Sequence, residues 1–324
     1  QGLRVIAAQE RAQLVEQRGA AVDQLPPELG QASQLEGLRI LRLEGAQLGR
    51  VMAIAWIDIR TAWRRPIYII FTVLFVLLIF AFVMGNVRVQ AGDVTAGGKQ
   101  AWMNSMFNAA FIDSALLGLL LPFLAAITAG LPLIADADRR VDRMVLATPL
   151  SPNMYVLGRW LGTLVPLCIC LAIFVFAEIV FFQFWPIDDP EKSRGPFDVW
   201  NFIFPGIVFG VPTIIAIAGS SMLLGVWTRQ AILVFLVPIA ILLGGVFLLW
   251  SWSPEWLPNW ANLALMQIDP TGNRWLGETW LKADRGVDFY NSQPMGVDPL
   301  FAISRLAWIA FGIVCAWFSA RIVA

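Results

Sequence analysis

The stretch from Pro66 to Gly85 contains no charged residue, and it constrains the fold more than any other part of the sequence. An apolar helix of about 20 residues is about 30 Å long, which matches the thickness of a hydrocarbon core. Composition agrees, because 58% of the residues are hydrophobic and only 14% are charged. Soluble domains average about 45–50% and about 25%. The sequence therefore predicts an all-α polytopic membrane protein.

Five further apolar stretches predict five more spans. They run from about Met106 to Ala135, Met154 to Trp185, Phe202 to Val226, Ala231 to Trp250 and Leu300 to Phe318. We divide the chain into a polar N-terminal extension at 1–50, expected to be helical, an amphipathic segment at 51–65 and a six-span domain at 66–324. A loop at 136–153 and an external segment at 251–299 connect spans of this domain.

The distribution of arginine predicts the orientation. Six spans place both termini on one side, where short connections carry Arg60, Arg64, Arg65, Arg139, Arg140, Arg143, Arg159, Arg229 and Arg321. Basic residues of the opposite side are spread over long loops that also carry Asp and Glu. Because Lys and Arg are enriched in short cytoplasmic connections, we expect both termini and the loop 136–153 in the cytoplasm. The expected location is a bacterial cytoplasmic membrane.

Missing residue types exclude several kinds of catalytic site. The chain has no histidine, which rules out a Ser-His-Asp centre, a His-ligated zinc and a HExxH helix. Its three cysteines lie in apolar stretches, where a thiol is usually a packing residue. A phosphate-binding P-loop needs GxxxxGK[ST], and Lys99, Lys192 and Lys282 lie in no such context. We expect no catalytic, cofactor-binding or metal site in this chain.

Residues 51–65 predict an amphipathic helix that lies on the membrane surface and leads into the first span. Ile54, Ile57 and Thr61 share one side of this helix. The residues expected at the interface are Trp56, Asp58, Arg60, Trp63, Arg64 and Arg65. A plain juxtamembrane anchor explains the pattern equally well.

The loop after the second span carries charges that alternate in sign. They are Asp136, Asp138, Arg139, Arg140, Asp142 and Arg143, and an apolar turn and the break Thr148–Pro152 follow them. A short helix with charges of both signs favours contact with a protein over contact with lipid. The alternative is a solvated loop with local ion pairs.

The stretch from Arg139 to Ser151, followed by Tyr155-Val156-Leu157-Gly158-Arg159, resembles the cytoplasmic loop of type-2 ATP-binding-cassette (ABC) exporter permeases. That resemblance implies a coupling helix that docks on a separate ATPase subunit. The coupling residues would be Asp138, Arg139, Arg140, Asp142, Arg143, Met144 and Leu146. It also implies that residues 51–65 are an interface helix, that a second permease half completes the transporter, and that ATP and Mg²⁺ bind the partner.

The segment 251–299 resembles the outward-facing short helices of the same family. It is rich in tryptophan and contains Pro254 and Pro258, so we expect it to lie at one membrane face with its indoles at the headgroup level. Ile268-Asp269-Pro270-Thr271-Gly272 is similar to permeases fused to an aminopeptidase. This chain lacks the HExxH motif of that enzyme, so we carry over no peptidase activity.

Two ionisable residues fall within predicted spans, Asp113 in the second and Glu178 in the third. Charged groups in lipid are costly and often functional, so both are candidates for a transport pathway. Asp113 could instead lie at the outer headgroup level. For Glu178, a role in a transport pathway or a buried hydrogen bond is one interpretation, and a position near the outer mouth is an equal alternative.

These features together predict the permease subunit of an ATP-driven exporter. Because the spans contain few polar groups, an apolar or amphiphilic substrate fits better than an ion. The alternative is a non-transporting membrane scaffold or regulator that recruits a cytoplasmic partner through the loop 136–153. An intramembrane enzyme is disfavoured, because no catalytic arrangement of residues stands out.

Overall fold

The structure is a computed structural model that describes residues 47–85, 90–91, 94–95, 102–141, 150–186, 190–250, 253–254, 256–283 and 285–323. The chain forms two compact units, Gln1–Arg50 and Val51–Ala324. Of the first unit, residues 47–50 are described, and they are helical. All other features given below belong to the second unit.

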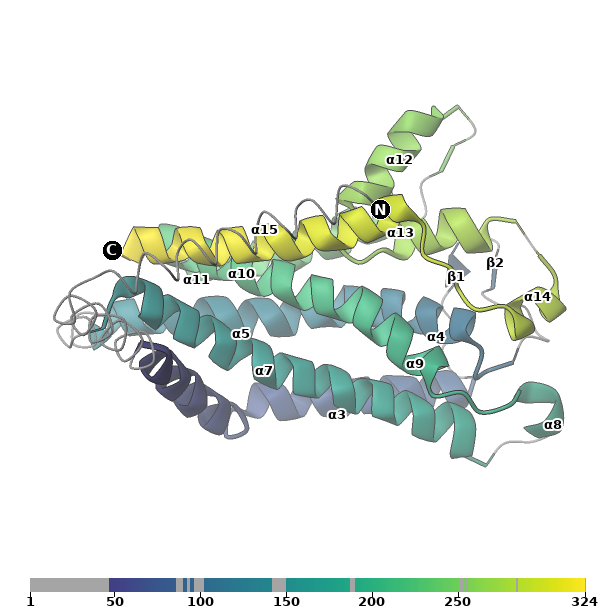
Figure 1. Cartoon of the computed structure of the whole chain (residues 1–324), viewed down its shortest axis with the longest axis horizontal. Helices are drawn as coiled ribbons and strands as arrows, with labels where there is room; N and C mark the ends of the chain where they lie inside the picture. The colour runs from purple at the N-terminus through teal and green to yellow at the C-terminus, as the bar shows by residue number, and fades with distance from the viewer. Residues whose placement is uncertain are drawn as a thin grey trace, which may run out of the picture. The chain divides into compact units, whose positions relative to one another are not determined.

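Six helical stretches are long and apolar enough to cross a membrane, as the sequence predicts. They are Pro66–Val83, Met106–Asp138, Pro152–Phe184, Trp200–Thr228, Ala231–Trp250 and Pro299–Val323. Figure 1 shows them lying side by side along the long axis of the unit. The protein is therefore an all-α polytopic membrane protein.

Four of these spans combine α-helix with π-helical turns. The first and last are the plain helices α3 (Pro66–Val83) and α15 (Pro299–Val323). The second joins α4 (Met106–Ile112), η1 (Asp113–Leu117) and α5 (Gly118–Asp138), and the third joins α7 (Pro152–Glu178) and η2 (Ile179–Phe184). The fourth joins α9 (Trp200–Pro205), η3 (Gly206–Gly210) and α10 (Val211–Thr228), and the fifth joins α11 (Ala231–Gly244) and η4 (Gly245–Trp250).

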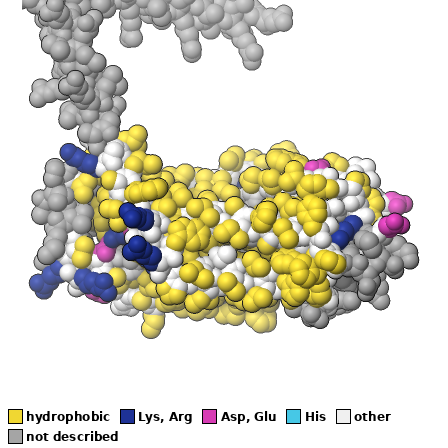
Figure 2. All heavy atoms as spheres, turned by 90° about the horizontal axis from the view of Figure 1, so that it is seen from below, with side chains coloured by type: hydrophobic (Ala, Val, Ile, Leu, Met, Phe, Trp, Pro, Cys, Tyr) yellow, Lys and Arg dark blue, Asp and Glu magenta, His cyan; other side chains and the backbone are white. Residues whose placement is uncertain are grey.

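The second and fourth spans form the centre of the bundle. In each of these two spans, 67% of the most apolar 18-residue stretch is buried inside the protein. The same share is 22% or less in the first, fifth and sixth spans. The exposed side chains of those outer helices are mostly Ile, Leu, Val, Phe and Trp, and hydrophobic side chains cover the middle of the face in Figure 2. Lipid solvates such a surface, whereas water would not.

Glycine lets the central helix α10 and the outer helix α15 touch through their backbones. A Cβ at Gly219 of α10 would overlap the backbone of Gly312 in α15, and a Cβ at Gly312 would overlap the carbonyl group of Ile215. Small residues at such contacts are how helices in lipid gain close packing. This pair fixes the last span against the centre of the bundle.

Short elements lie in the connections. A two-residue hairpin pairs β1 (Gln90–Ala91) with β2 (Val94–Thr95), and α8 (Pro190–Ser193) lies between the third and fourth spans. Before the last span come α12 (Asn259–Ile268), α13 (Asn273–Leu276), η5 (Gly277–Leu281) and α14 (Val287–Ser292). We call the end of the bundle that carries α12–α14 the distal end. The opposite end, where Asp138, Pro152, Thr228 and Val323 lie, is the basal end (Figure 1).

The helix of the amphipathic segment differs from the sequence prediction at its end. It ends at residue 62 rather than 65, because Pro66 restricts the preceding Arg65 to an extended backbone, here φ −86° and ψ 119°. Its buried side carries Val51, Ala55 and Ala62, while Ile57 is 64% exposed. We call residues 51–62 the interface helix.

Candidate functional site

The interface helix packs closely on the basal end of α7. A Cβ at Gly158 would lie 2.8 Å from Cβ of Ile54, and a Cβ at Gly162 would lie 2.6 Å from Cβ of Asp58. These two glycines are four residues apart and therefore lie on one side of α7. They form a groove in which the interface helix lies.

Arg159 lies beside this groove and connects three helices. Its Nη1 donates a hydrogen bond of 2.6 Å to Oδ1 of Asp58 in the interface helix, and its Nη2 pairs with Oδ2 of Asp136 in α5. The Tyr155 hydroxyl, one turn earlier in α7, donates a bond of 2.5 Å to the same oxygen of Asp136. One guanidinium group thus binds two carboxylates from different helices.

The Arg159 network is largely removed from water. Its side chains are 13–19% exposed, with Arg159 at 19%, Asp58 at 13% and Asp136 at 16%. Burial raises the pKa of the Asp58 carboxyl above its ordinary value, although the Arg159 and Arg65 guanidinium groups act to lower it. With Arg159 absent, two carboxylates would share a poorly solvated site without this cation.

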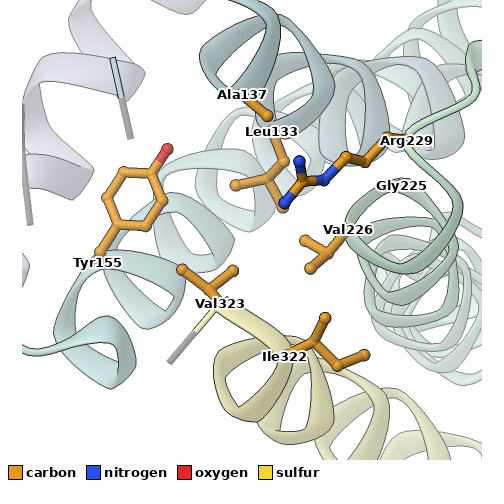
Figure 3. A pocket seen from close by; sticks show the side chains of 8 residues that line it. All are labelled: Leu133, Ala137, Tyr155, Gly225, Val226, Arg229, Ile322 and Val323. Carbon is orange, nitrogen blue, oxygen red and sulfur yellow. The ribbon is translucent and has the colours of Figure 1, made fainter. Parts of the chain in front are cut away.

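A small pocket lies at the same end of the bundle. Its volume is about 70 Å³, and its walls come from α5, α7, α10 and α15. Figure 3 shows the lining residues, which are Leu133, Ala137, Tyr155, Gly225, Val226, Arg229, Ile322 and Val323. The basal ends of these four helices therefore enclose a small space among them.

The predicted coupling residues divide into two groups. Asp138, Arg139 and Arg140 lie at the basal end of α5 and are exposed, so a partner protein could reach them. The backbone of Arg140 is left-handed, with φ 57°, which ends the helix there. The others, Asp142, Arg143, Met144 and Leu146, lie outside the described residues.

The predicted residues of the interface helix lie on both of its sides. Asp58 faces α7, whereas Trp56 is 63% exposed. Arg60 and Arg64 are also exposed. Trp63, 37% exposed, and Arg65 belong to the turn that leads into α3. The exposed tryptophans suit a helix that lies at a membrane surface.

Asp113 and Glu178 come together inside the bundle. Both side chains are completely buried, and the two carboxyl groups lie beside each other. A Cβ at Gly206 would be 3.8 Å from Oδ2 of Asp113, so the fourth span also borders the pair. Protein groups surround both side chains, whose exposure is 0%.

In the distal motif Ile268–Gly272, residues 269–272 form a buried turn, while Ile268 is exposed. Oδ1 of Asp269 accepts hydrogen bonds from the backbone N–H and the hydroxyl of Thr271 (2.9 and 2.7 Å), and its Oδ2 accepts one from the Arg274 backbone N–H at 2.9 Å. Arg305 of α15 donates to the carbonyl groups of Asp269 and Pro270 at 2.6 and 2.8 Å. Through these contacts the motif anchors the connection 251–299, which we call the distal segment, to the last span.

The tryptophans of the distal segment do not share one environment. Trp256 and Trp260 are 72% and 74% exposed, whereas Trp275 is 2% exposed. The Trp275 ring stacks on Phe301 with a centroid separation of 3.7 Å. Trp275 therefore packs inside the protein, and the placement of the indoles at the headgroup level stays a prediction.

Comparisons with known proteins agree with this architecture. The family model described as ABC-2 family transporter protein matches residues 52–268, more than half of the chain. The chain belongs to the ABC-2 transporter family. A search of curated proteins found no match, and the narrower likeness to aminopeptidase-fused permeases is not confirmed.

Membership of the ABC-2 transporter family makes this protein an integral membrane subunit of an ABC transporter. Such a subunit is a component of membrane transport and is not itself catalytic. The family implies in general a partner ABC ATPase and a dimer of permeases. The match begins inside the interface helix and includes Asp58, Asp136 and Arg159.

Proposed function

We propose that this ABC-2 protein is the permease of an ATP-driven exporter, and that a separate ABC ATPase binds its basal end. The partner would bind ATP and Mg²⁺ and hydrolyse the nucleotide. The observation that carries this proposal is the Arg159 network, because it joins Asp58 of the interface helix to Asp136 of α5. Those helices and α7 are the elements that an ATPase at the basal end would move.

The position of the network explains how movement of the partner would reach the spans. The coupling loop 136–153 leaves α5 at Asp138 and enters α7 at Pro152. Arg159 and Tyr155 tie these two helix ends together through Asp136. A displacement of the loop therefore moves α5, α7 and the interface helix as one body. The basal pocket leaves room for that displacement against α10 and α15.

The distribution of charge supports a cytoplasmic basal end. Figure 2 shows Lys and Arg side chains gathered there on the face it presents, and Arg60, Arg64, Arg139 and Arg140 are exposed. Short cytoplasmic connections are rich in such residues. Both termini would then be cytoplasmic and the distal segment external, in a bacterial cytoplasmic membrane.

The transported substrate would be apolar or amphiphilic, and the working unit a homodimer or heterodimer. The outer spans expose mainly aliphatic and aromatic side chains, which suit contact with lipid and with a lipid-like cargo. The family match does not favour the alternative of a non-transporting scaffold.

The experiment tests binding of the ATPase at the basal end. The tagged protein is purified from native membranes, and the ATP hydrolysis of the eluate is measured for wild type and for the double variant Arg140→Glu and Arg143→Glu. We expect wild type to retain an ABC ATPase. The charge reversal should reduce the retained activity at least about tenfold, because like charges across an interface are strongly unfavourable.

The matched control reverses charge at the distal end. Lys282 and Arg285 are replaced by Glu, and this variant should retain the ATPase at the wild-type level. Full retention by the basal double variant would show that loop 136–153 is not the docking element. The absence of any ATPase from wild-type preparations would favour the scaffold.

A further inference from the structure

We propose that Asp113 and Glu178 form a proton-binding site within the membrane-spanning bundle. The two carboxyl groups share at least one proton while the spans are packed as in this structure. The site releases protons when this part of the bundle opens to water. The inference uses only the residues of this chain and does not depend on the identity of the ATPase.

The first observation is that the pair is buried without compensation. Each side chain has 0% exposure, and none of the four carboxyl oxygens accepts a hydrogen bond from an N–H or O–H group of the described residues. A buried ionised carboxylate without a partner is very costly, and two adjacent ones would also repel each other. A proton bound by the pair removes the repulsion between two negative charges. It also provides a hydrogen-bond partner, because the protonated carboxyl group donates a hydrogen bond to the other.

The second observation is that no other charged group of the described part of the chain faces the pair. Among the described residues, Asp113 is the one ionisable neighbour that influences Glu178, and Glu178 is the one that influences Asp113. The fourth span presents Gly206 here, and Val175 of α7 packs against that glycine. Arginine or lysine therefore does not neutralise the pair, in contrast to the network at Arg159.

The third observation is that three π-helical turns meet at this level. Asp113 is the first residue of η1, Glu178 immediately precedes η2, and Gly206 is the first residue of η3. Single π-turns within helices are rare and are frequent at functional sites. Each of the three residues lies six or seven positions from the distal end of its span, which is about 10 Å at 1.5 Å per residue.

A layer of polar groups, in which Asn104 is buried and Gln183 and Asn201 are partly buried, lies between the pair and the distal end. Nδ2 of Asn104 donates to Oε1 of Gln183 at 2.7 Å, and Asn201 donates to the Asn104 carbonyl group at 3.2 Å. Gln183 and Asn201 are each five residues nearer the distal end than Glu178 and Gly206. Toward the basal end, the neighbouring side chains Leu117 and Leu171 are apolar. A proton from the pair would therefore leave toward the distal side.

The test is reaction with dicyclohexylcarbodiimide, a lipid-soluble reagent that modifies protonated carboxyl groups in apolar surroundings. The full chain in lipid vesicles is treated across a range of pH, and the modified residues are identified by mass spectrometry. We expect modification of Asp113 or Glu178 at neutral pH and at least tenfold less as the pair loses its protons at high pH. The exposed Asp288 should remain unmodified and serves as the control.

Infrared spectroscopy of the same vesicles gives a second measurement. The C=O stretch of a protonated carboxylic acid should be present at neutral pH and should be reduced in the Glu178→Gln variant. The control variant Glu278→Gln should leave this band unchanged. If Glu178→Gln fails to fold, the wild-type band and the carbodiimide reaction still decide.

No modification and no such band at neutral pH would overturn the proposal. The proposal would also be overturned if Na⁺, added at constant pH, prevented the reaction of the pair with the carbodiimide. The site would then bind a metal cation rather than a proton.

Discussion

Removal of Arg159 should destabilise the protein more than removal of any exposed arginine at the same end. The substitution is Arg159→Met, which keeps an unbranched side chain and deletes the charge. It leaves Asp58 and Asp136, 13% and 16% exposed, without their shared cation. We expect the spans to form, because their apolar length is unchanged, but the attachment of the interface helix to α7 should weaken.

The magnitude follows from the burial of the three groups. Loss of one partner from a fully buried ion pair costs about 3–5 kcal/mol. Here partial exposure reduces that cost, and uptake of protons by the orphaned carboxylates limits it, at about 1.4 kcal/mol for each pKa unit. We therefore expect a loss of about 2–4 kcal/mol at neutral pH. For Arg139→Met the expected change is within about 0.5 kcal/mol, because that side chain is exposed.

Thermal unfolding in detergent can be followed with a maleimide dye that fluoresces on reaction with thiols. Cys170 and Cys315 are buried and become reactive on unfolding, and the exposed Cys168 is first replaced by alanine. A loss of about 2–4 kcal/mol corresponds to a midpoint lower by about 5–10 °C for a domain of this size.

Two outcomes would refute the reasoning. The first is a midpoint for Arg159→Met that equals that of Arg139→Met. The second is a loss that stays constant as the pH falls, because protonation of Asp58 and Asp136 should relieve their repulsion. Addition of Asp58→Asn to Arg159→Met should restore part of the stability, since it removes one of the two orphaned carboxylates.

Three further predictions concern packing, pH and topology. Gly219→Ala should lower the unfolding midpoint, because its Cβ would overlap the backbone of α15, whereas Gly244→Ala meets nothing within 4 Å and should be neutral or slightly stabilising. The pKa of Asp58 is higher in the folded protein than in the unfolded chain. At a pH between these two values, Asp58 is protonated in the folded protein and ionised in the unfolded chain. Stability should thus fall as pH rises from about 4 through that pKa, and Asp58→Asn should flatten the decline. Cysteines at Thr148 and Ser193 should react with an impermeant thiol reagent from opposite membrane faces, and reaction from one face would contradict the six-span topology.

The spans could be predicted from sequence because their signal is local. The stretch Pro66–Gly85 is long enough to cross a membrane and has no charged residue. These two properties predict a span without any knowledge of the rest of the chain, because lipid solvates the apolar side chains directly. The end of the interface helix was predicted at residue 65 and lies at residue 62, although Pro66 after Arg65 is a signal for an earlier end. The side of the interface helix that packs on α7 could not be predicted. Ile54 and Ile57 show that the helix carries apolar side chains, but either lipid or α7 can cover an apolar side chain.

The Arg159 network and the carboxyl pair could not be predicted as units. Asp58 and Arg159 are 101 residues apart, and Asp113 and Glu178 come from different spans, so only the packing of helices brings them together. One signal was available, because Gly158 and Gly162 are four residues apart beside a charged residue in an apolar stretch. Such spacing indicates a helix packed at that site.

The two polar clusters are joined by the same pair of spans. The second span carries Asp136 near its basal end and Asp113 toward its distal end, and the third carries Arg159 and Glu178 in the same order. Nineteen residues separate Arg159 from Glu178, which is about 28 Å of helix. The basal cluster contains a cation, Arg159, and holds the spans by ion pairs. No cation of the described residues faces the distal cluster, which we propose to be held by a shared proton. A partner that tilts these spans at the basal end would therefore strain the proton-binding contact at the other end, where π-turns allow the helices to yield.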